Sequence, residues 1–143
     1  MWERPKIGLP ARKCRAGGER GACTLLAVFH ERNPAGDGFL IAFDGAARAV
    51  RCAMAVRDHL RHIGLEVRSG IHAGECDESG GKLIGIAVHI GSRLLGLAEP
   101  GEVLVSSTVK DLVAGSGIEF DDRGEHTLRD IAGAWRLYAP RAS

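Results

Sequence analysis

The sequence has 143 residues, and its 19 Lys or Arg and 18 Asp or Glu residues give a formal net charge of +1 at neutral pH. This balance creates no overall field that would attract nucleic acid or an acidic membrane, so an anionic ligand has to be bound locally. Hydrophobic residues make up 45% and charged residues 26%, which excludes a disordered chain and allows one packed domain.

Residues 1–21 are rich in Arg, Gly and Pro and show neither helical nor strand periodicity. They are predicted to form a disordered basic leader, followed by one domain over 22–143. The sequence contains no run of about 18 apolar residues and no apolar core of a secretory signal, so it predicts no membrane segment. Four cysteines without a C-x-x-C pair predict free thiols in a reducing cytoplasm rather than a metal site.

Three short patterns predict how the domain begins. Cys23–Phe29 is continuously apolar, and its pattern fits either a strand or a buried helix. The turn-forming residues 33–38 precede the apolar run Phe39–Phe43, which predicts a tight turn that enters a strand. Asp44 follows this run and is predicted to cap the next helix at its amino end.

The middle of the sequence changes from a helical pattern to a strand pattern. Apolar residues recur every three or four positions from Ala46 to Ile63, and Gly64 then predicts the end of an amphipathic helix. Residues 65–74 alternate as in a half-buried strand. Residues 76–82 are predicted to form a flexible loop.

The last part of the sequence predicts two further helices and three short strands. In chain order these are a helix over 84–98, a strand at 102–105, a short helix that ends near 114, and strands at 118–120 and 135–139. A serine or threonine at 106–108 is expected to cap the short helix. The order of elements predicts an α+β sandwich with helices on one face of a largely antiparallel sheet.

A few polar residues lie in positions where they could bind a ligand. Asp37 lies between two glycines at the start of an apolar strand, where a carboxylate can meet a metal ion, but the same residues also fit a simple hairpin turn. His89 and Arg93 are four residues apart and share one face of the predicted helix, either as a solvated surface or as an anion site. His72 is expected to be structural, and Arg129 fits a surface turn.

Five ordered stretches between about Asn33 and Tyr138 resemble one known family. They are A-G-D-G-F at 35–39, L-E-V-R-S-G-I-H-A-G-E at 65–75, G-I-A-V-H-I-G-S-R at 85–93, P-G-E-V-L-V-S-S-T-V at 100–109 and D-R-G-E-H-T-L at 122–128. On these stretches the chain is similar to the catalytic domain of class III adenylate and guanylate cyclases, especially the bacterial, mycobacterial-type branch.

The resemblance implies a fold, a reaction and partners. The fold is a ferredoxin-like α+β sandwich. The enzyme converts a nucleoside triphosphate, here ATP more than GTP, to a 3',5'-cyclic monophosphate and pyrophosphate with Mg²⁺ or Mn²⁺ as cofactor. Its active sites form across a head-to-tail dimer, so the expected partner is a second cyclase domain, in a homodimer or a heterodimer.

The same resemblance implies roles for individual residues. Asp37 matches the second metal-binding carboxylate, and Arg93 matches the arginine that stabilises the transition state. Arg129 falls where a residue that binds the triphosphate is expected. His89 stands where the family usually has the asparagine that orients the ribose.

Two further positions concern the choice of base. Asn33 occupies the position of the base-selecting lysine, and Lys82 lies where a base-reading aspartate or threonine is common. Both residues are therefore candidates for contact with the substrate base.

The chain departs from the family ahead of Asp37. The family begins with a strand that contains the first metal-binding aspartate, followed by a helix and another strand. Before Asp37 this chain has only Glu3, Glu19 and Glu31 as acidic residues, none in that context. We therefore expect the first strand and helix to be missing, with the basic leader in their place, and the isolated chain to be a poor cyclase. The alternative is a catalytically dead dimerisation or regulatory module.

Overall fold

The structure is a computed structural model that describes residues 22–30, 38–79 and 82–141. The predicted leader at 1–21 and the candidate residues Asn33 and Asp37 lie outside these ranges. No helix in the described part of the chain is long and apolar enough to cross a membrane.

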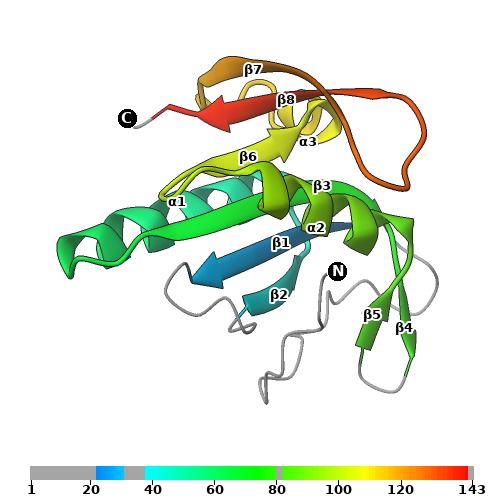
Figure 1. Ribbon diagram of the computed structural model, residues 1–143, viewed down its shortest axis with the longest axis horizontal. Helices are drawn as coiled ribbons and strands as arrows, with labels where there is room; N and C mark the ends of the chain where they lie inside the picture. Colours follow the sequence, from blue (N-terminus) through cyan, green and yellow to red (C-terminus); the bar gives the residue numbers. More distant parts are fainter. Residues whose placement is uncertain (1–21, 31–37, 80–81, 142–143) are drawn as a thin grey trace.

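A six-stranded sheet forms the centre of the molecule, with the strand order β2-β1-β3-β6-β8-β7 (Figure 1). Its strands are β1 (Ala22–His30), β2 (Gly38–Phe43), β3 (Val67–Glu75), β6 (Val103–Ser106), β7 (Phe120–Thr127) and β8 (Ala134–Pro140). Only the pairing of β3 with β6 is parallel. The prediction of an α+β fold with a largely antiparallel sheet is confirmed.

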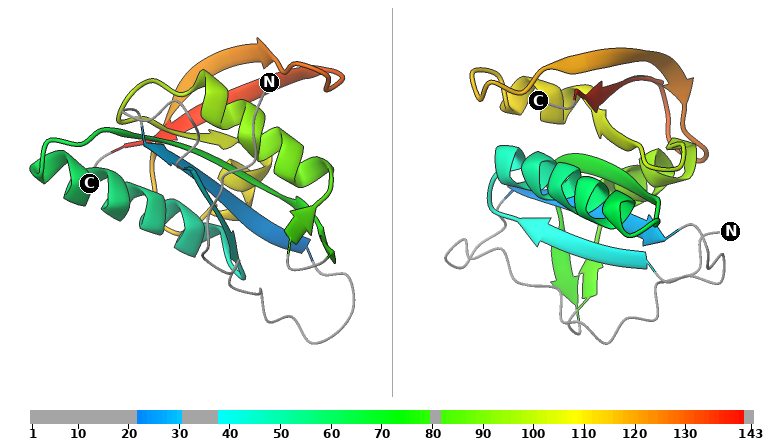
Figure 2. Two further views of the ribbon diagram at one scale, coloured as in Figure 1. Left: turned by 60° about the horizontal axis from the view of Figure 1, so that its bottom comes forward. Right: turned by 90° about the vertical axis from the view of Figure 1, so that its left-hand side faces the viewer.

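Helices lie on both faces of this sheet, not on one as expected. They are α1 (Ala46–His62), α2 (Ile86–Leu97) and α3 (Ser107–Leu112). Successive residues of β6 point to opposite faces of the sheet. Val103 and Val105 belong to the core beneath α1 and α3, whereas Leu104 belongs to the core beneath α2. In the left view of Figure 2, β1 and β3 run between α1 and α2.

The apolar run that the sequence left undecided is a strand. β1 lies between β2 and β3 and is antiparallel to both, with Leu26 opposite Ile41 on one side and Ile71 on the other. A strand therefore occupies this inner sheet position. It contains no Asp or Glu, so it lacks the metal-binding aspartate of the first strand in the cyclase family. Among the described residues, no helix precedes α1.

The ends of α1 confirm one prediction and correct another. Gly64 has φ of +78° just after the helix, as expected of a glycine that ends one. The residue at the amino-terminal cap is Gly45, without a side-chain hydrogen bond. Asp44 instead pairs with Arg48 one turn along, at 3.2 Å. The predicted capping role of Asp44 is therefore wrong, because its carboxylate is satisfied by a side chain.

The segment predicted as a loop at 76–82 contains a small hairpin. Its strands are β4 (Asp77–Ser79) and β5 (Lys82–Ile84), and Glu78 lies opposite Leu83. In Figure 1 this hairpin projects beyond the main sheet. Strands of three residues are too short to show the alternation that would have predicted them.

The cysteines only partly follow the prediction of free thiols. Cys52 on α1 is a free, half-buried thiol, and burial raises its pKa. Cys76 is disulfide-bonded, so the prediction is wrong for this residue.

Two glycines on one face of β3 allow α2 to pack directly against the strand. A Cβ atom added at Gly70 would lie 2.5 Å from the carbonyl oxygen of Gly91 and 2.5 Å from the amide nitrogen of Leu95. A Cβ atom added at Gly74 would lie 2.9 Å from the Cβ of Ala87. The backbones of β3 and α2 are therefore in contact, which fixes the position of the helix.

His72 lies between these two glycines and is buried, with 6% of its surface exposed. Its Nδ1 is hydrogen-bonded to the Oγ of Ser106 at 2.7 Å, and its ring meets the edge of Trp135 with centroids 5.7 Å apart. Ser106 also caps α3, because its Oγ accepts a hydrogen bond from the Val109 amide. These contacts support the structural role predicted for His72, since they tie β3, β6, α3 and β8 together.

The contact at Gly70 predicts the effect of a single methyl group. We expect Gly70→Ala to lower the free energy of unfolding by about 1–3 kcal/mol, because α2 would have to move away from β3. Gly96→Ala is the matched control: Gly96 is exposed on α2 with no atom within 4 Å of an added Cβ, and alanine should stabilise the helix by about 0.5–1 kcal/mol. Urea unfolding of the two variants measures both changes in the free energy of unfolding. Equal changes would contradict the close packing of α2 on β3.

Burial of His72 predicts a pH-dependent stability. Desolvation lowers the pKa of His72 to about 4, so the folded protein keeps the ring neutral while the unfolded chain takes up a proton near its ordinary value. Stability should therefore fall as the pH drops from about 6.5 towards about 4, by roughly 1–3 kcal/mol in total. Urea unfolding at a series of pH values from neutral down to about 5 tests this prediction. Most carboxylates titrate below that range, so they do not obscure the effect.

Two variants isolate the contribution of His72. His72→Asn should flatten the pH dependence in this range, whereas the exposed His62→Asn should leave it unchanged. An unchanged slope in His72→Asn would show that another group is responsible.

Candidate active site

Helix α2 holds the two candidate residues that the sequence placed on one face. Ile90 and Leu94 are buried in the core beneath the helix, which fixes its rotation. His89 is exposed, and 23% of the Arg93 side chain is exposed. The predicted helix is confirmed, and with it the spacing of one turn between His89 and Arg93.

The turn at 128–131 lies beside α2 and contains Arg129. Leu128 is 2% exposed and packs in the same core cluster as Ile90 and Leu94, with Ile131 at its edge. The Ile131 amide donates a hydrogen bond to the Leu128 carbonyl oxygen at 3.1 Å, which closes the turn. An apolar contact thus brings Arg129 to the helix that holds Arg93.

One carboxylate joins the two arginines. The Nη2 of Arg93 donates to the Oδ2 of Asp130 at 3.3 Å, and the Nε of Arg129 lies 4.0 Å from the same oxygen. The two guanidinium groups therefore converge on a single anionic oxygen. Sequence analysis missed Asp130, because nothing in the pattern shows that residues 37 positions apart meet.

Arg93 retains capacity to bind a further acceptor. Its Nε is buried and has no hydrogen-bond partner in the described part of the structure. A guanidinium group has five N–H donors in a planar fork, and a buried donor without a partner costs free energy. The arrangement is therefore suited to an additional oxygen ligand, such as that of a phosphate.

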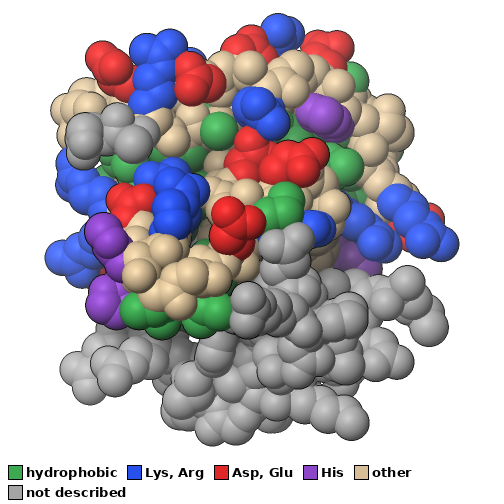
Figure 3. Space-filling model, turned by 60° about the vertical axis from the view of Figure 1, so that its left-hand side comes forward, with side chains coloured by type: hydrophobic (Ala, Val, Ile, Leu, Met, Phe, Trp, Pro, Cys, Tyr) green, Lys and Arg blue, Asp and Glu red, His purple; other side chains and the backbone are tan. Residues whose placement is uncertain are grey.

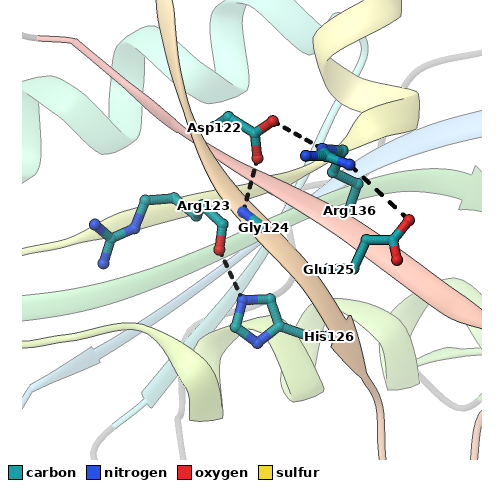
Figure 4. Close-up of polar contacts among 6 residues, drawn as sticks. All are labelled: Asp122, Arg123, Gly124, Glu125, His126 and Arg136. Carbon is teal, nitrogen blue, oxygen red and sulfur yellow. Dashed lines mark hydrogen bonds and ion pairs between the residues drawn. The ribbon is translucent and has the colours of Figure 1, made fainter.

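Polar contacts join β7 and β8, the two strands on either side of the turn (Figure 4). Asp122 accepts hydrogen bonds from the Gly124 amide and from the Nε of Arg136, each at 2.7 Å. Both contacts lower the pKa of Asp122, the amide more, while Asp122 raises the pKa of Arg136. Glu125 lies 3.9 Å from the Nη1 of Arg136, so one arginine on β8 pairs with two carboxylates on β7.

An irregularity in β7 explains why a glycine lies in this stretch. The register with β8 shifts between Asp122 and Glu125, and Gly124 has φ of +83°. The ring Nε2 of His126 donates to the Arg123 carbonyl oxygen at 2.9 Å across the same bulge. The D-R-G-E-H stretch therefore shapes the hairpin that leads into the turn of Arg129.

The remaining candidates are not brought to this cluster by the described structure. Lys82 is the first residue of β5, and the structure describes its backbone position only. Asn33 and Asp37 lie outside the described residues. Within the described residues there is no group of three or more His, Cys, Asp or Glu side chains that could hold a metal ion.

The surface around the domain mixes charges of both signs. On the face drawn in Figure 3, Lys and Arg side chains are interspersed with Asp and Glu. This agrees with the small net charge, and it means that an anion would be bound by local contacts such as those of Arg93 and Arg129.

No protein-family model matches the chain. In sequence, a candidate adenylate cyclase of Rhizobium meliloti is 32% identical over 105 residues, which cover 67% of this chain and 18% of that relative. An uncharacterised protein of Mycobacterium bovis is 34% identical over 100 residues, which cover 67% of this chain and 34% of that relative. The chain thus spans about a fifth to a third of the curated relatives that it matches.

Solved structures show the same fold. The adenylate/guanylate cyclase/hydrolase from Silicibacter pomeroyi has a TM-score of 0.74 and 24% identity, over 86% of this chain and 98% of that chain. The adenylyl cyclase CyaB from P. aeruginosa has a TM-score of 0.75 and 19% identity, over 87% and 96% of the two chains. The fold is that of the class III nucleotide cyclase catalytic domain, and the resemblance drawn from the five stretches is confirmed.

Proposed function

We propose that this class III cyclase-type domain takes part in converting a nucleoside triphosphate to a 3',5'-cyclic monophosphate and pyrophosphate, and that it provides the arginines that bind the phosphates. The observation that supports this most strongly is the meeting of Arg93 and Arg129 at one carboxylate oxygen. Two arginines from separate segments that reach one anionic oxygen are suited to bind neighbouring phosphate groups.

The proposed roles follow from the chemistry of the reaction. The ribose 3'-hydroxyl attacks the α-phosphorus and pyrophosphate leaves, so negative charge grows on the phosphoryl oxygens. Arg93 is partly buried on a rigid helix and would stabilise that charge. Arg129 is largely exposed and would hold the outer phosphates. His89, one turn from Arg93, would orient the ribose.

The described residues do not by themselves form a metal site. They contain no group of three possible ligands, and β1 contains no acidic residue. Mg²⁺ is usually held by one or two carboxylates together with substrate phosphates and water. We therefore derive no step through a metal in this chain, and we propose that Asp37 is at most one ligand in a site completed by a partner.

A dimer with a second cyclase domain follows from this division. We propose that the partner supplies the metal-binding carboxylates while this chain supplies Arg93, Arg129 and His89. A heterodimer with a complete domain would be active, and a homodimer would be weak. ATP is the proposed substrate ahead of GTP, with Asn33 and Lys82 near the base, and the proposed location is the cytoplasm.

A second candidate function is a catalytically dead dimerisation or regulatory module. The observation that favours it is the absence of acidic residues from β1. Such a module would keep the cyclase fold and the partner surface without supporting turnover.

A complementation assay tests the first candidate. The purified chain is mixed with an intact cyclase domain that lacks its own transition-state arginine, and cyclic AMP and cyclic GMP are measured with ATP or GTP and Mn²⁺. We expect product in the mixture and almost none from either protein alone. Arg93→Ala should reduce the product about 100- to 1,000-fold, the usual cost of removing one donor that stabilises a transition state.

The matched control is Arg48→Ala. Arg48 is an exposed arginine on α1 that pairs with Asp44 just before the helix, and its loss should leave the rate unchanged. Equal rates for Arg93→Ala and Arg48→Ala would contradict the role of Arg93. Complex formation without product, in a mixture shown to contain both folded chains, would favour the regulatory module.

A further inference from the structure

We infer that Asp130 lowers the affinity of the phosphate site: its carboxylate pairs with Arg93 and Arg129 and competes with phosphate for them. This inference rests on the proposed function, because it assigns a second partner to the same two arginines. The competition would weaken the binding of any phosphate ligand that has to displace the carboxylate.

The backbone at Asp130 is unusual. Its φ of +63° is the only positive value at a non-glycine residue in the described part of the chain. Asp130 is the third residue of the turn closed between Leu128 and Ile131, where a positive φ favours glycine or asparagine. A glycine would adopt this conformation without strain. The carboxylate is thus the feature that an aspartate adds at this position.

The contacts of Asp130 define what the carboxylate does. Its Oδ2 accepts from the Nη2 of Arg93 at 3.3 Å and lies 4.0 Å from the Nε of Arg129. An acceptor between two guanidinium groups offsets their mutual repulsion and keeps both near one point. A phosphate oxygen would use the same donors, so the carboxylate and the phosphate compete.

The exposure of Asp130 and Arg129 shows why a polyphosphate would displace the Asp130 carboxylate. The side chains of Asp130 and Arg129 are 75% and 74% exposed, and exposed ion pairs are weak. The triphosphate carries several negative charges and contacts both arginines at once, so it would displace the carboxylate. The cyclic product carries one negative charge and would gain less, so Asp130 would favour its release.

The experiment measures binding of inorganic tripolyphosphate and of inorganic phosphate to the full chain by calorimetry at low salt. Asp130→Asn keeps a residue that tolerates a positive φ and removes the charge. We expect it to tighten tripolyphosphate binding roughly threefold to tenfold and phosphate binding by less, because the repulsion that is removed grows with the charge of the ligand. Asp130→Gly should give the same shift, because it removes the charge and relaxes the backbone.

Two further variants separate this inference from the proposed function. Asp44→Asn, which removes the carboxylate of the exposed Asp44–Arg48 pair at the start of α1, should not change binding. In an Arg93→Ala background the effect of Asp130→Asn should largely disappear. If Asp130→Asn binds tripolyphosphate like the wild type while Arg93→Ala binds it more weakly, the inference about Asp130 is wrong and the phosphate site stands. If neither Arg93→Ala nor Arg129→Ala weakens binding, the phosphate site itself is wrong.

Discussion

The direct contact between the backbones of α2 and β3 is the constraint on which the candidate site depends. It exists because Gly70 and Gly74 have no Cβ atoms on the strand face beneath the helix. The contact sets the height and rotation of α2, and hence the position of Arg93. Leu128 then packs against the same helix and brings Arg129 close. The two charged groups are thus positioned by apolar and backbone packing, which is rigid, while the charges themselves contribute little to stability.

The polar contacts of the site divide into two kinds. Those on β7 and β8, from Asp122 to Arg136 and to the Gly124 amide, are satisfied within the hairpin and leave little capacity for a ligand. The contacts of Arg93 are incomplete, since its buried Nε has no partner among the described residues. Nearly all buried donors in proteins have a partner, so an unpaired one is a place where a ligand can add a hydrogen bond. We therefore assign ligand binding to α2 and the turn, and a structural role to the hairpin of β7 and β8.

The sequence predicted most of the fold, because long periodic segments such as Ala46–Ile63 determine their own structure. Its failures include two local features and one contact between distant segments. The capping role of Asp44 was wrong because Arg48 satisfies that carboxylate, and the hairpin at 77–84 was missed because its strands have only three residues each. Resemblance identified Arg93 and Arg129 as candidates, but only the structure showed their meeting at Asp130. Spacing in the sequence contains no information on contacts across 37 residues.

The central claim is that Arg93 and Arg129 bind one polyphosphate. Nuclear magnetic resonance of the arginine Nε–H groups tests it directly, during titration of the full chain with a non-cyclisable ATP analogue. If the claim is right, the resonances of Arg93 and Arg129 will shift together with one dissociation constant, while those of Arg48 and Arg141, which pair with carboxylates elsewhere, will stay in place. Independent shifts of the two, or shifts no larger than those of Arg48 and Arg141, would contradict it.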